Sequence, residues 1–129
     1  MPIEAIRERE RLNSVNSYYL GSRDPALDGL ARLAGAIFGV PYASVSIVEK
    51  DRAILVGALG LEFESVDRCD SICSGVIRSQ MISVVADTHK DERLSKNRFV
   101  VGAPNLRFAA AAPIINDKGF VLGGFCLGD

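Results

Sequence analysis

The chain of 129 residues has the size of one globular domain, whose core can hold a fold without metal or disulfide staples. Its 15 lysines and arginines nearly balance 16 aspartates and glutamates, which excludes the basic surface that nucleic acid or an anionic membrane would need. The charged first eleven residues lack the apolar stretch of a signal peptide, and no apolar run approaches the roughly 20 residues of a membrane span, so we expect a cytoplasmic domain.

The N-terminal segment, residues 2–16, is rich in Glu and Arg and has a thin apolar stripe. This pattern predicts a charged helix, and the stripe fits packing on the chain's own domain as well as contact with a second copy. Residues 13–22, where Ser, Asn and Gly cluster, are expected to be a connection. We therefore assign residues 1–22 to an N-terminal helix and connection, and residues 23–129 to the main domain.

A second helix has clear start and stop signals. Asp24 suits the N-cap, Pro25 the first helical position and Gly39 the C-terminal cap, and Pro41 prevents continuation. Between these signals, apolar residues recur at spacings of three and four, as in an amphipathic helix: Leu27, Leu30, Leu33, Ala34, Ile37 and Phe38.

A hairpin and a long loop are predicted next. Residues 43–48 alternate small apolar residues with serine, which predicts a half-buried strand. A polar turn leads to a second strand at residues 53–58, and the two strands form a hairpin. Residues 59–70 contain a glycine, four acids and no steady period, so we expect a long loop of the kind that often carries function.

The second half of the chain is expected to begin with a helix. Asp70 or Ser71 can cap a helix that runs to about Gln80. Its buried side is predicted to consist of Ile72, Cys73, Val76 and Ile77.

Strands follow this helix. A short strand is predicted at residues 82–85, and the polar residues 87–101 are expected to hold only a turn or two of helix. Residues 107–115 and 119–127 are predicted strands, joined through a strong turn signal at residues 116–119. Hairpins at both ends with helices between them indicate the α+β class, an antiparallel sheet with helices packed on it.

The cysteines fit buried thiols better than a catalytic apparatus. Three cysteines at irregular spacing favour reduced thiols over a disulfide framework. A reactive thiolate at Cys73 is conceivable, but the only histidine, His89, has no motif linking it to Cys73. Free cysteine is among the most buried residue types, so the core interpretation is favoured for Cys73 and more strongly for Cys126. Cys69, in the predicted loop, is expected to be the most exposed, and a Cys69–Cys73 redox pair is a minor alternative.

Charged side chains give no clear site. Asp87, His89 and Asp91 lack metal-ligand spacing and are interpreted as solvated surface, so no metal is expected. Four arginines can either converge on an anionic ligand or form ordinary surface pairs, and the second interpretation is favoured: Arg68, Arg93, Arg98 and Arg107. No phosphate loop, Gly-x-Ser-x-Gly or Cys-x-x-Cys motif occurs, so catalysis has no visible apparatus.

Small residues mark the last two predicted strands. Residues 109–112, Gly123 and Gly124 leave volume above a sheet, which fits a ligand cavity as well as tight helix packing. Pro113 has no N–H to donate to a ladder, so its strand must end, bulge or lie exposed near that point.

Several short segments, in order along residues 24–129, carry a family resemblance. They include Phe38-Gly39-Val40-Pro41, Ser71-Ile72-Cys73, Val85-Ala86-Asp87, Asp91-Glu92-Arg93 with Asn97, Leu106-Arg107-Phe108 and Leu122-Gly123. In order and spacing they resemble the GAF domains found at the front of bacterial diguanylate cyclases, phosphodiesterases and sensor kinases. The resemblance implies a five- or six-stranded antiparallel sheet with the N-terminal helices on one face. A ligand pocket then lies on the other face, under the helix at Ser71 and the long loops.

The resemblance also implies a function. Such domains bind a small molecule or mediate dimerisation, without catalysis, and pass the result to an output domain, here absent from the chain, as in cyclic di-GMP and histidine kinase signalling. We therefore expect a homodimer with an unidentified ligand. The expected pocket residues are Cys73, Val76, Ile77, Arg93, Phe99, Arg107, Ala109, Ala111, Gly124 and Cys126.

Two subgroups of the family bear on cofactor and activity. Bilin-binding members attach the chromophore through a cysteine followed by histidine, whereas here Asp70 follows Cys69 and Ser74 follows Cys73. Covalent bilin is therefore not expected, and the cofactor is unknown. The alternative function is a redox enzyme similar to the free methionine sulfoxide reductases, although the three cysteine positions do not match theirs in an obvious way.

Overall fold

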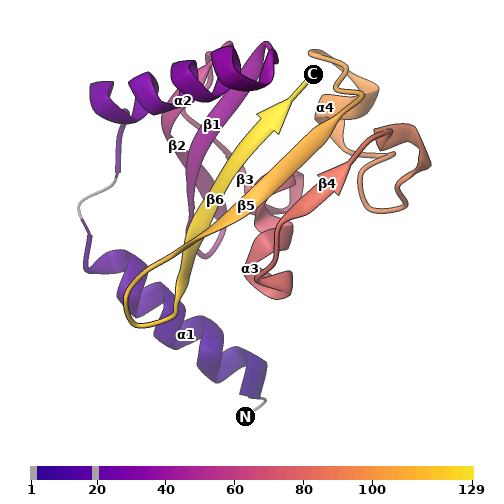
Figure 1. Cartoon of the computed structure of the whole chain (residues 1–129). Helices are drawn as coiled ribbons and strands as arrows, with labels where there is room; N and C mark the ends of the chain where they lie inside the picture. The colour runs from indigo at the N-terminus through magenta and orange to yellow at the C-terminus, as the bar shows by residue number, and fades with distance from the viewer. Residues whose placement is uncertain (1–2, 19–20) are drawn as a thin grey trace.

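The structure, a computed structural model, describes residues 3–18 and 21–129 (Figure 1). Within them, six strands form one antiparallel sheet in the order β3-β2-β1-β6-β5-β4. The strands are β1 (Tyr42–Val48), β2 (Arg52–Leu59), β3 (Ser65–Asp67), β4 (Ser83–Val85), β5 (Ala109–Ile115) and β6 (Val121–Gly128). The α-helices are α1 (Ile3–Asn16), α2 (Pro25–Phe38), α3 (Gly75–Ser79) and α4 (Arg98–Val101), and single 3-10 turns are η1 (Arg68–Asp70), η2 (Ile72–Ser74) and η3 (Thr88–Lys90). The predicted α+β class and antiparallel sheet are confirmed.

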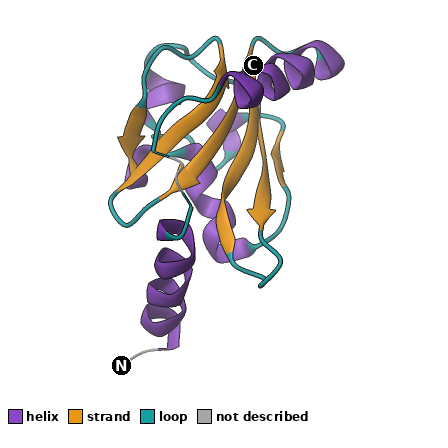
Figure 2. Cartoon of the chain, turned by 90° about the vertical axis from the view of Figure 1, so that its left-hand side faces the viewer, coloured by secondary structure: helices purple, strands orange, loops and turns teal. Residues whose placement is uncertain are grey.

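Two layers of helix cover the two faces of the sheet (Figure 2). α1 and α2 lie on one face, where Val15 and Leu27 pack into a core cluster with Val45 and Val56. η2 and α3 lie on the other face, where Cys73 joins a second cluster with β5 and β6. No helix in the described part of the chain is long and apolar enough to cross a membrane.

The first helix is confirmed, and it packs on its own domain. Its side chains Arg11 and Val15 are buried, while Ile3 is exposed. The helix continues to Asn16, so the connection predicted from residue 13 starts later than expected. Residue 2 of the predicted helix and residues 19–20 of the connection lie outside the described residues.

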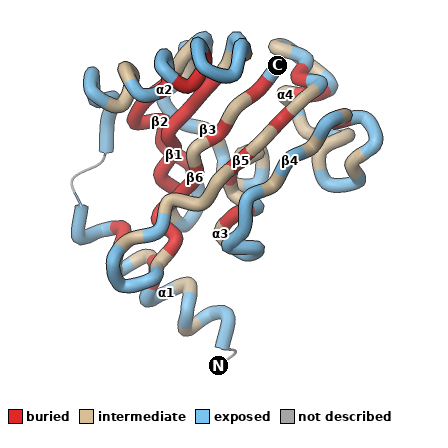
Figure 3. Tube along the Cα trace, viewed as in Figure 1, coloured by how far each residue is buried: buried red, intermediate tan, exposed pale blue. Residues whose placement is uncertain are grey.

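α2 has the predicted boundaries. The Asp24 carboxylate accepts a 2.8 Å hydrogen bond from the Ala26 N–H, and Gly39 ends the helix in the left-handed region at φ 66°. Its burial is less expected, because most of the helix is exposed (Figure 3). Its buried residues are the small Ala31, Ala34 and Gly35. The larger residues Leu30, Leu33, Ile37 and Phe38 are between 49 % and 67 % exposed.

The close approach of α2 to the sheet explains this orientation. A Cβ on Gly57 of β2 would lie 2.5 Å from the backbone carbonyl of Leu27. A Cβ on Gly35 would lie 2.3 Å from a Leu59 methyl group. Only small residues fit between elements this close, so Leu30, Leu33, Ile37 and Phe38 turn outward, and Leu27 alone of the large apolar residues of α2 packs into the core cluster.

β1 is buried on both faces, not half-buried as predicted. All of residues 43–48 are buried, because β1 lies between β2 and β6, with α1 and α2 on one face of the sheet and η2 and α3 on the other (Figure 3). The predicted pairing of β1 with β2 is confirmed.

Two expected boundaries in the middle of the chain are wrong. Residues 59–70 are not wholly loop, because β3 and η1 lie within them. The single helix expected from residue 70 or 71 to Gln80 is instead η2 followed by the short α3. Ser71 provides no side-chain cap, and the Ser74 hydroxyl donates a 2.8 Å bond back to the Ser71 carbonyl, a local bond that competes with helix formation.

The last hairpin agrees with the sequence. Gly119 has φ 86°, and the Asn116 side chain accepts hydrogen bonds from the N–H groups of Lys118 and Phe120. β4 pairs only with residues 109–111 of β5, so Pro113 lies beyond the end of β4, where a missing N–H breaks no ladder on that side.

Candidate functional site

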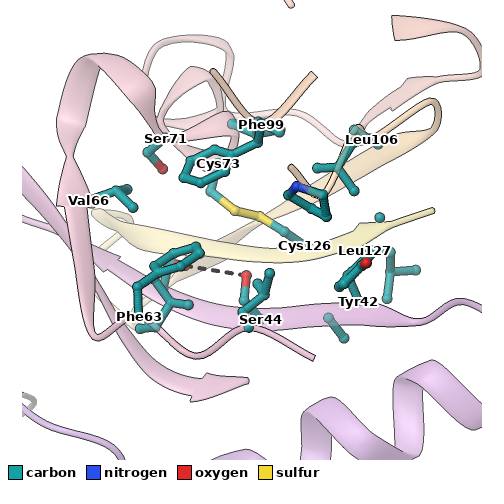
Figure 4. A pocket seen from close by; sticks show the side chains of 18 residues that line it. Tyr42, Ser44, Phe63, Val66, Ser71, Cys73, Phe99, Leu106, Cys126 and Leu127 are labelled. Carbon is teal, nitrogen blue, oxygen red and sulfur yellow. Dashed lines mark hydrogen bonds between the residues drawn. A yellow bond between two sulfur atoms is a disulfide. The ribbon is translucent and has the colours of Figure 1, made fainter. Parts of the chain in front are cut away.

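A cavity of about 70 Å³ lies on the face of the sheet opposite α2 (Figure 4). β1 and β6 form its floor, and η2, α4 and the segment before β3 form its walls. Its lining includes Ser44, Ser46, Phe63, Cys73, Phe99 and Cys126. The position agrees with the pocket that the family resemblance implies, under the segment at Ser71 and the long loops.

Two aromatic rings from different loops meet at this cavity. Phe63 comes from the segment after β2 and Phe99 from α4, and their ring centroids are 5.2 Å apart with planes 15° from parallel. The Arg98 guanidinium lies 5.0 Å from the centroid of the Phe99 ring. Stacked rings hold a cavity wall by about 0.5 to 1.5 kcal/mol beyond their burial, so this contact can open for an occupant without unfolding the domain.

Asn97 positions Phe99. Its side-chain oxygen accepts a 2.9 Å bond from the Phe99 N–H and so caps α4. Its amide nitrogen donates a 2.8 Å bond to the Asp70 carbonyl, and the Leu106 N–H donates to the Phe99 carbonyl at 2.8 Å. The Asn97 side chain thereby links α4 to η1 at one end of the cavity.

Cys73 and Cys126 are joined by a disulfide in the cavity wall (Figure 4). Their burial was predicted, with relative exposures of 4 % and 8 %, but the expected reduced thiols and the alternative Cys69–Cys73 pair are both wrong. Cys69 is exposed and free. The fold brings η2 onto β6, so Cys73 bonds to Cys126 of the last hairpin and not to the nearby Cys69.

A second cavity of about 180 Å³ lies on the other side of Ser71, Ile72 and Ala109. Its lining is more polar and includes several serines, Asn97 and Arg93. Arg93 forms a 3.4 Å ion pair with Asp91 and is mostly exposed, so it lies at the rim.

The expected pocket residues fall into three groups. Cys73, Phe99, Ala109 and Cys126 line the first cavity, while Val76, Arg93 and Ala111 line the second together with Ala109. Ile77, Arg107 and Gly124 line neither. The role of any of them as a ligand contact stays a prediction.

The three residues outside the cavities have structural contacts instead. Gly124 lies where a Cβ would be 3.1 Å from the Cβ of Cys73, so it allows close packing. Arg107 donates to the Val100 carbonyl at 3.1 Å and to the Leu106 carbonyl at 3.0 Å. Ile77 packs against the apolar cluster around Cys73.

The four arginines do not converge on one ligand, as the favoured interpretation predicted. Arg93 and Arg98 pair with Asp91 and Asp70 at 3.4 Å and 4.0 Å, and Arg68 pairs with Glu8 of α1. Arg68 also donates a 3.1 Å bond to the Glu49 carbonyl. Arg68 therefore ties η1, next to the cavity, to the N-terminal helix.

Glu8 connects Arg68 to the buried Arg11. Burial raises the pKa of Glu8, but hydrogen bonds and charge attraction from Arg11 and Arg68 outweigh it and lower the pKa from 4.5 to about 2. Arg11 also donates to the carbonyls of Val48 at 2.9 Å and Val121 at 3.1 Å. The Glu8 carboxylate is thus an anion between two cations, and Glu8, Arg11 and Arg68 together hold α1 to the sheet.

The chemistry of the first cavity is apolar. No charged residue is among the lining residues of this cavity, whose polar groups are chiefly the hydroxyls of Tyr42, Ser44, Ser46 and Ser71. Across residues 3–18 and 21–129, no group of three or more His, Cys, Asp or Glu side chains is placed to hold a metal ion. The cavity therefore suits a small neutral molecule with an apolar body.

Sequence reasoning missed part of this lining. Ser44 and Ser46 were assigned to the open face of a half-buried strand, yet both are buried, with the Ser46 hydroxyl 3.5 Å from that of Ser44. Their alternation with apolar residues identifies one face of β1, and only the fold shows that this face lies over a cavity. Phe63 is the one aromatic residue of residues 59–70, and this is the sequence signal that points to it.

Comparison with known proteins gives a consistent family match. Residues 22–129 match the family described as GAF domain. A cyclic di-GMP phosphodiesterase of Pseudomonas aeruginosa is 32 % identical over 106 residues, which cover 82 % of this chain and 18 % of that protein. The chain thus spans less than a fifth of the length of that relative.

Solved structures match the fold over nearly the whole chain. The GAF domain of a phosphoenolpyruvate-protein phosphotransferase from Coxiella burnetii superposes with a TM-score of 0.67 at 16 % identity, covering 97 % of this chain and 76 % of the other. A free methionine-R-sulfoxide reductase from Neisseria meningitidis, in complex with its substrate, superposes with a TM-score of 0.65 at 18 % identity, covering 100 % and 77 %. At these identities the likeness shows the fold alone.

Proposed function

The chain belongs to the GAF domain family, and we propose that it is a non-catalytic regulatory domain that binds a small neutral molecule in the cavity between Phe63, Phe99 and the β1–β6 floor. The observation that carries this proposal is an apolar cavity with no charged lining residue, placed where two loops meet. Catalysis of acid–base type needs titratable groups of suitable pKa in the site, and this lining supplies few.

The size of the cavity supports a sensing role. A dry apolar cavity of about 150 Å³ holds benzene, whereas this cavity measures about 70 Å³. An aromatic occupant therefore requires Phe63 and Phe99 to separate, which moves α4 and the segment before β3. That segment leads through β3 into η1, where Arg68 pairs with Glu8 of α1, so occupancy shifts the population of α1 positions.

Ligand binding is testable through thermal stability. We expect benzene and indole at tenfold excess over their dissociation constants to raise the melting temperature by about 3 °C or more, whereas the charged analogue benzoate leaves it unchanged. Ala109→Val adds two methyl groups to the cavity lining and is expected to remove the benzene shift. Circular dichroism melting curves measure both effects.

A neighbouring position of the same strand provides the control. Ala112 lies on β5 and lines neither cavity, so Ala112→Val is expected to keep the full benzene shift. No shift with any neutral probe, or equal shifts in both variants, would rule out ligand binding in this cavity.

Two wider roles are part of the proposal. The length of the Pseudomonas relative supports an output domain elsewhere in the full protein, with cyclic di-GMP turnover as the class of output. The exposed apolar residues Leu30, Leu33 and Ile37 of α2 support a homodimer. Sedimentation of the wild-type chain as a monomer at a concentration of about 1 mM would count against the dimer.

Thiol-dependent sulfoxide reduction is a second candidate function, favoured by the two cysteines in the cavity wall. One thiolate would attack the sulfoxide sulfur and the second thiol would close the disulfide, giving the thioether and one water per two thiols. The lining has no histidine or carboxylate to supply protons, which makes this the weaker candidate. Failure to convert free methionine sulfoxide to methionine with excess dithiothreitol would eliminate it.

A further inference from the structure

Two cysteines 53 residues apart in sequence meet between η2 and the central strand β6. Their Cα atoms lie 6.3 Å apart and their sulfur atoms are bonded. Disulfides have Cα separations of about 4.4 to 6.8 Å, so this backbone accommodates the bond as it stands.

Gly124 allows the two cysteines to meet. A Cβ at this position would lie 3.1 Å from the Cβ of Cys73 and 3.3 Å from a methyl group of Val76. The missing side chain lets η2 and α3 rest directly on β6. When the bond is open, the apolar packing of Val76 and Ile77 against the sheet remains to hold this short segment in place.

The first cavity gives small molecules access to both sulfurs. Cys73 and Cys126 line it, although each is less than 10 % exposed at the surface. A water molecule needs about 10 to 15 Å³ of such space, and the cavity of about 70 Å³ admits a molecule as small as hydrogen peroxide.

We propose that Cys73 and Cys126 form a reversible thiol–disulfide pair that hydrogen peroxide closes and that locks η2 and α3 onto the sheet. One thiolate attacks a peroxide oxygen and becomes a sulfenic acid, releasing the first water. The second thiol attacks that sulfur, forms the disulfide and releases the second water, so two thiols are oxidised per peroxide. A dithiol reductant reverses the reaction by thiol–disulfide exchange.

The state of the Cys73–Cys126 bond affects the size of the cavity, and this regulatory effect rests on the proposed function. In the disulfide form, η2 is fixed to β6, so an occupant gains room only where Phe63 and Phe99 separate. In the dithiol form, η2 and α3 can move away from the sheet and admit a larger occupant. The redox step itself does not depend on any ligand, so its failure is distinguishable from failure of ligand binding.

Thiol counting tests the redox step. The reduced Cys69→Ser chain is expected to lose both alkylatable thiols with one equivalent of peroxide, to yield a cross-linked Cys73–Cys126 peptide by mass spectrometry, and to regain both thiols in dithiothreitol without denaturant. Cys126→Ser is expected to form no intramolecular bond. Thiols that survive peroxide in the folded chain, or a bond that dithiothreitol reduces only after unfolding, would overturn the proposal.

Hydrogen exchange tests the lock. We expect amides of residues 72–79 to exchange about tenfold faster in the dithiol form than in the disulfide form, with β1 and β2 unchanged. Cys126→Ser should exchange at the dithiol rate under both conditions, while Cys69→Ser should switch like the wild type. Equal exchange of residues 72–79 in the two redox forms would show that the bond locks nothing.

Discussion

Gly123→Ala is expected to destabilise the domain by at least about 3 kcal/mol, because the new methyl group would collide with the neighbouring backbone. A Cβ at Gly123 would lie 1.8 Å from the Ser46 carbonyl oxygen and 2.9 Å from the Ile47 Cα. Neither atom belongs to a flexible side chain, so β1 and β6 must separate at the centre of the sheet. Urea unfolding at constant redox state measures the loss.

Gly75→Ala is the matched control for this substitution. A Cβ at Gly75 meets no atom within 4 Å, and the residue has helical angles of φ −61° and ψ −27° at the start of α3. Alanine there reduces the entropy of the unfolded chain, so we expect a gain of about 0.5 to 1 kcal/mol. Similar stabilities of the two variants would contradict the close approach at Gly123.

Local signals in the sequence predicted local structure well. Asp24, Pro25 and Gly39 specify α2 through caps that involve only neighbouring residues, and the helix has the expected ends. The helix after Ser71 was predicted too long, because its cap was inferred from residue type alone and the serine makes no such bond. Capping is a geometric property, so a suitable residue is necessary but not sufficient for it.

The sequence did not predict the contacts between distant segments. Nothing in the spacing of Cys73 and Cys126 indicates that η2 lies on β6, so the nearer Cys69 was the natural partner to consider. The orientation of α2 is a similar case: four of its large apolar residues face outward because Gly57 brings β2 too close for them. Such features depend on the separation of packed elements, which no single segment encodes.

The burial of the charged Arg11 is another feature that the sequence pattern does not indicate. In the sequence it belongs to a run of Glu and Arg that is typical of a solvated helix, yet it is only 4 % exposed. Two backbone carbonyls and Glu8 accept its hydrogen bonds, and these acceptors offset the cost of burying the charge. The fold supplies the acceptors, so the burial of this one arginine among several was not predictable.

Arg11→Met is therefore expected to cost about 3 to 5 kcal/mol of unfolding free energy. The substitution keeps an unbranched side chain of similar reach but leaves the carbonyls of Val48 and Val121 without their donor. The exposed Arg9, on the same helix, provides the control, because Arg9→Met is expected to change stability by less than about 0.5 kcal/mol. Urea unfolding at pH 7 compares the three chains, and equal losses in both variants would argue against a specific role for Arg11.

Glu8→Gln tests the same group through its pH dependence. The folded-state pKa of Glu8, about 2, lies below its usual 4.5, so the ionised carboxylate stabilises the folded chain above pH 4.5 and that contribution is lost as the pH falls toward 2. Because the side chain is about 30 % exposed, we expect the wild type to exceed Glu8→Gln by about 1 to 2 kcal/mol at pH 7.

This advantage should fall by more than half at pH 3, where an unfolded glutamate is almost fully protonated and the folded one is still mostly ionised. Asp28, whose pKa the Ala58 N–H and Arg23 also lower, loses stability in the same acid range, but it does so equally in both chains. The difference between wild type and Glu8→Gln therefore isolates the pair of arginines around Glu8. A difference that stays constant from pH 7 to pH 3 would mean that Glu8 holds α1 by packing and hydrogen bonding that do not require its charge.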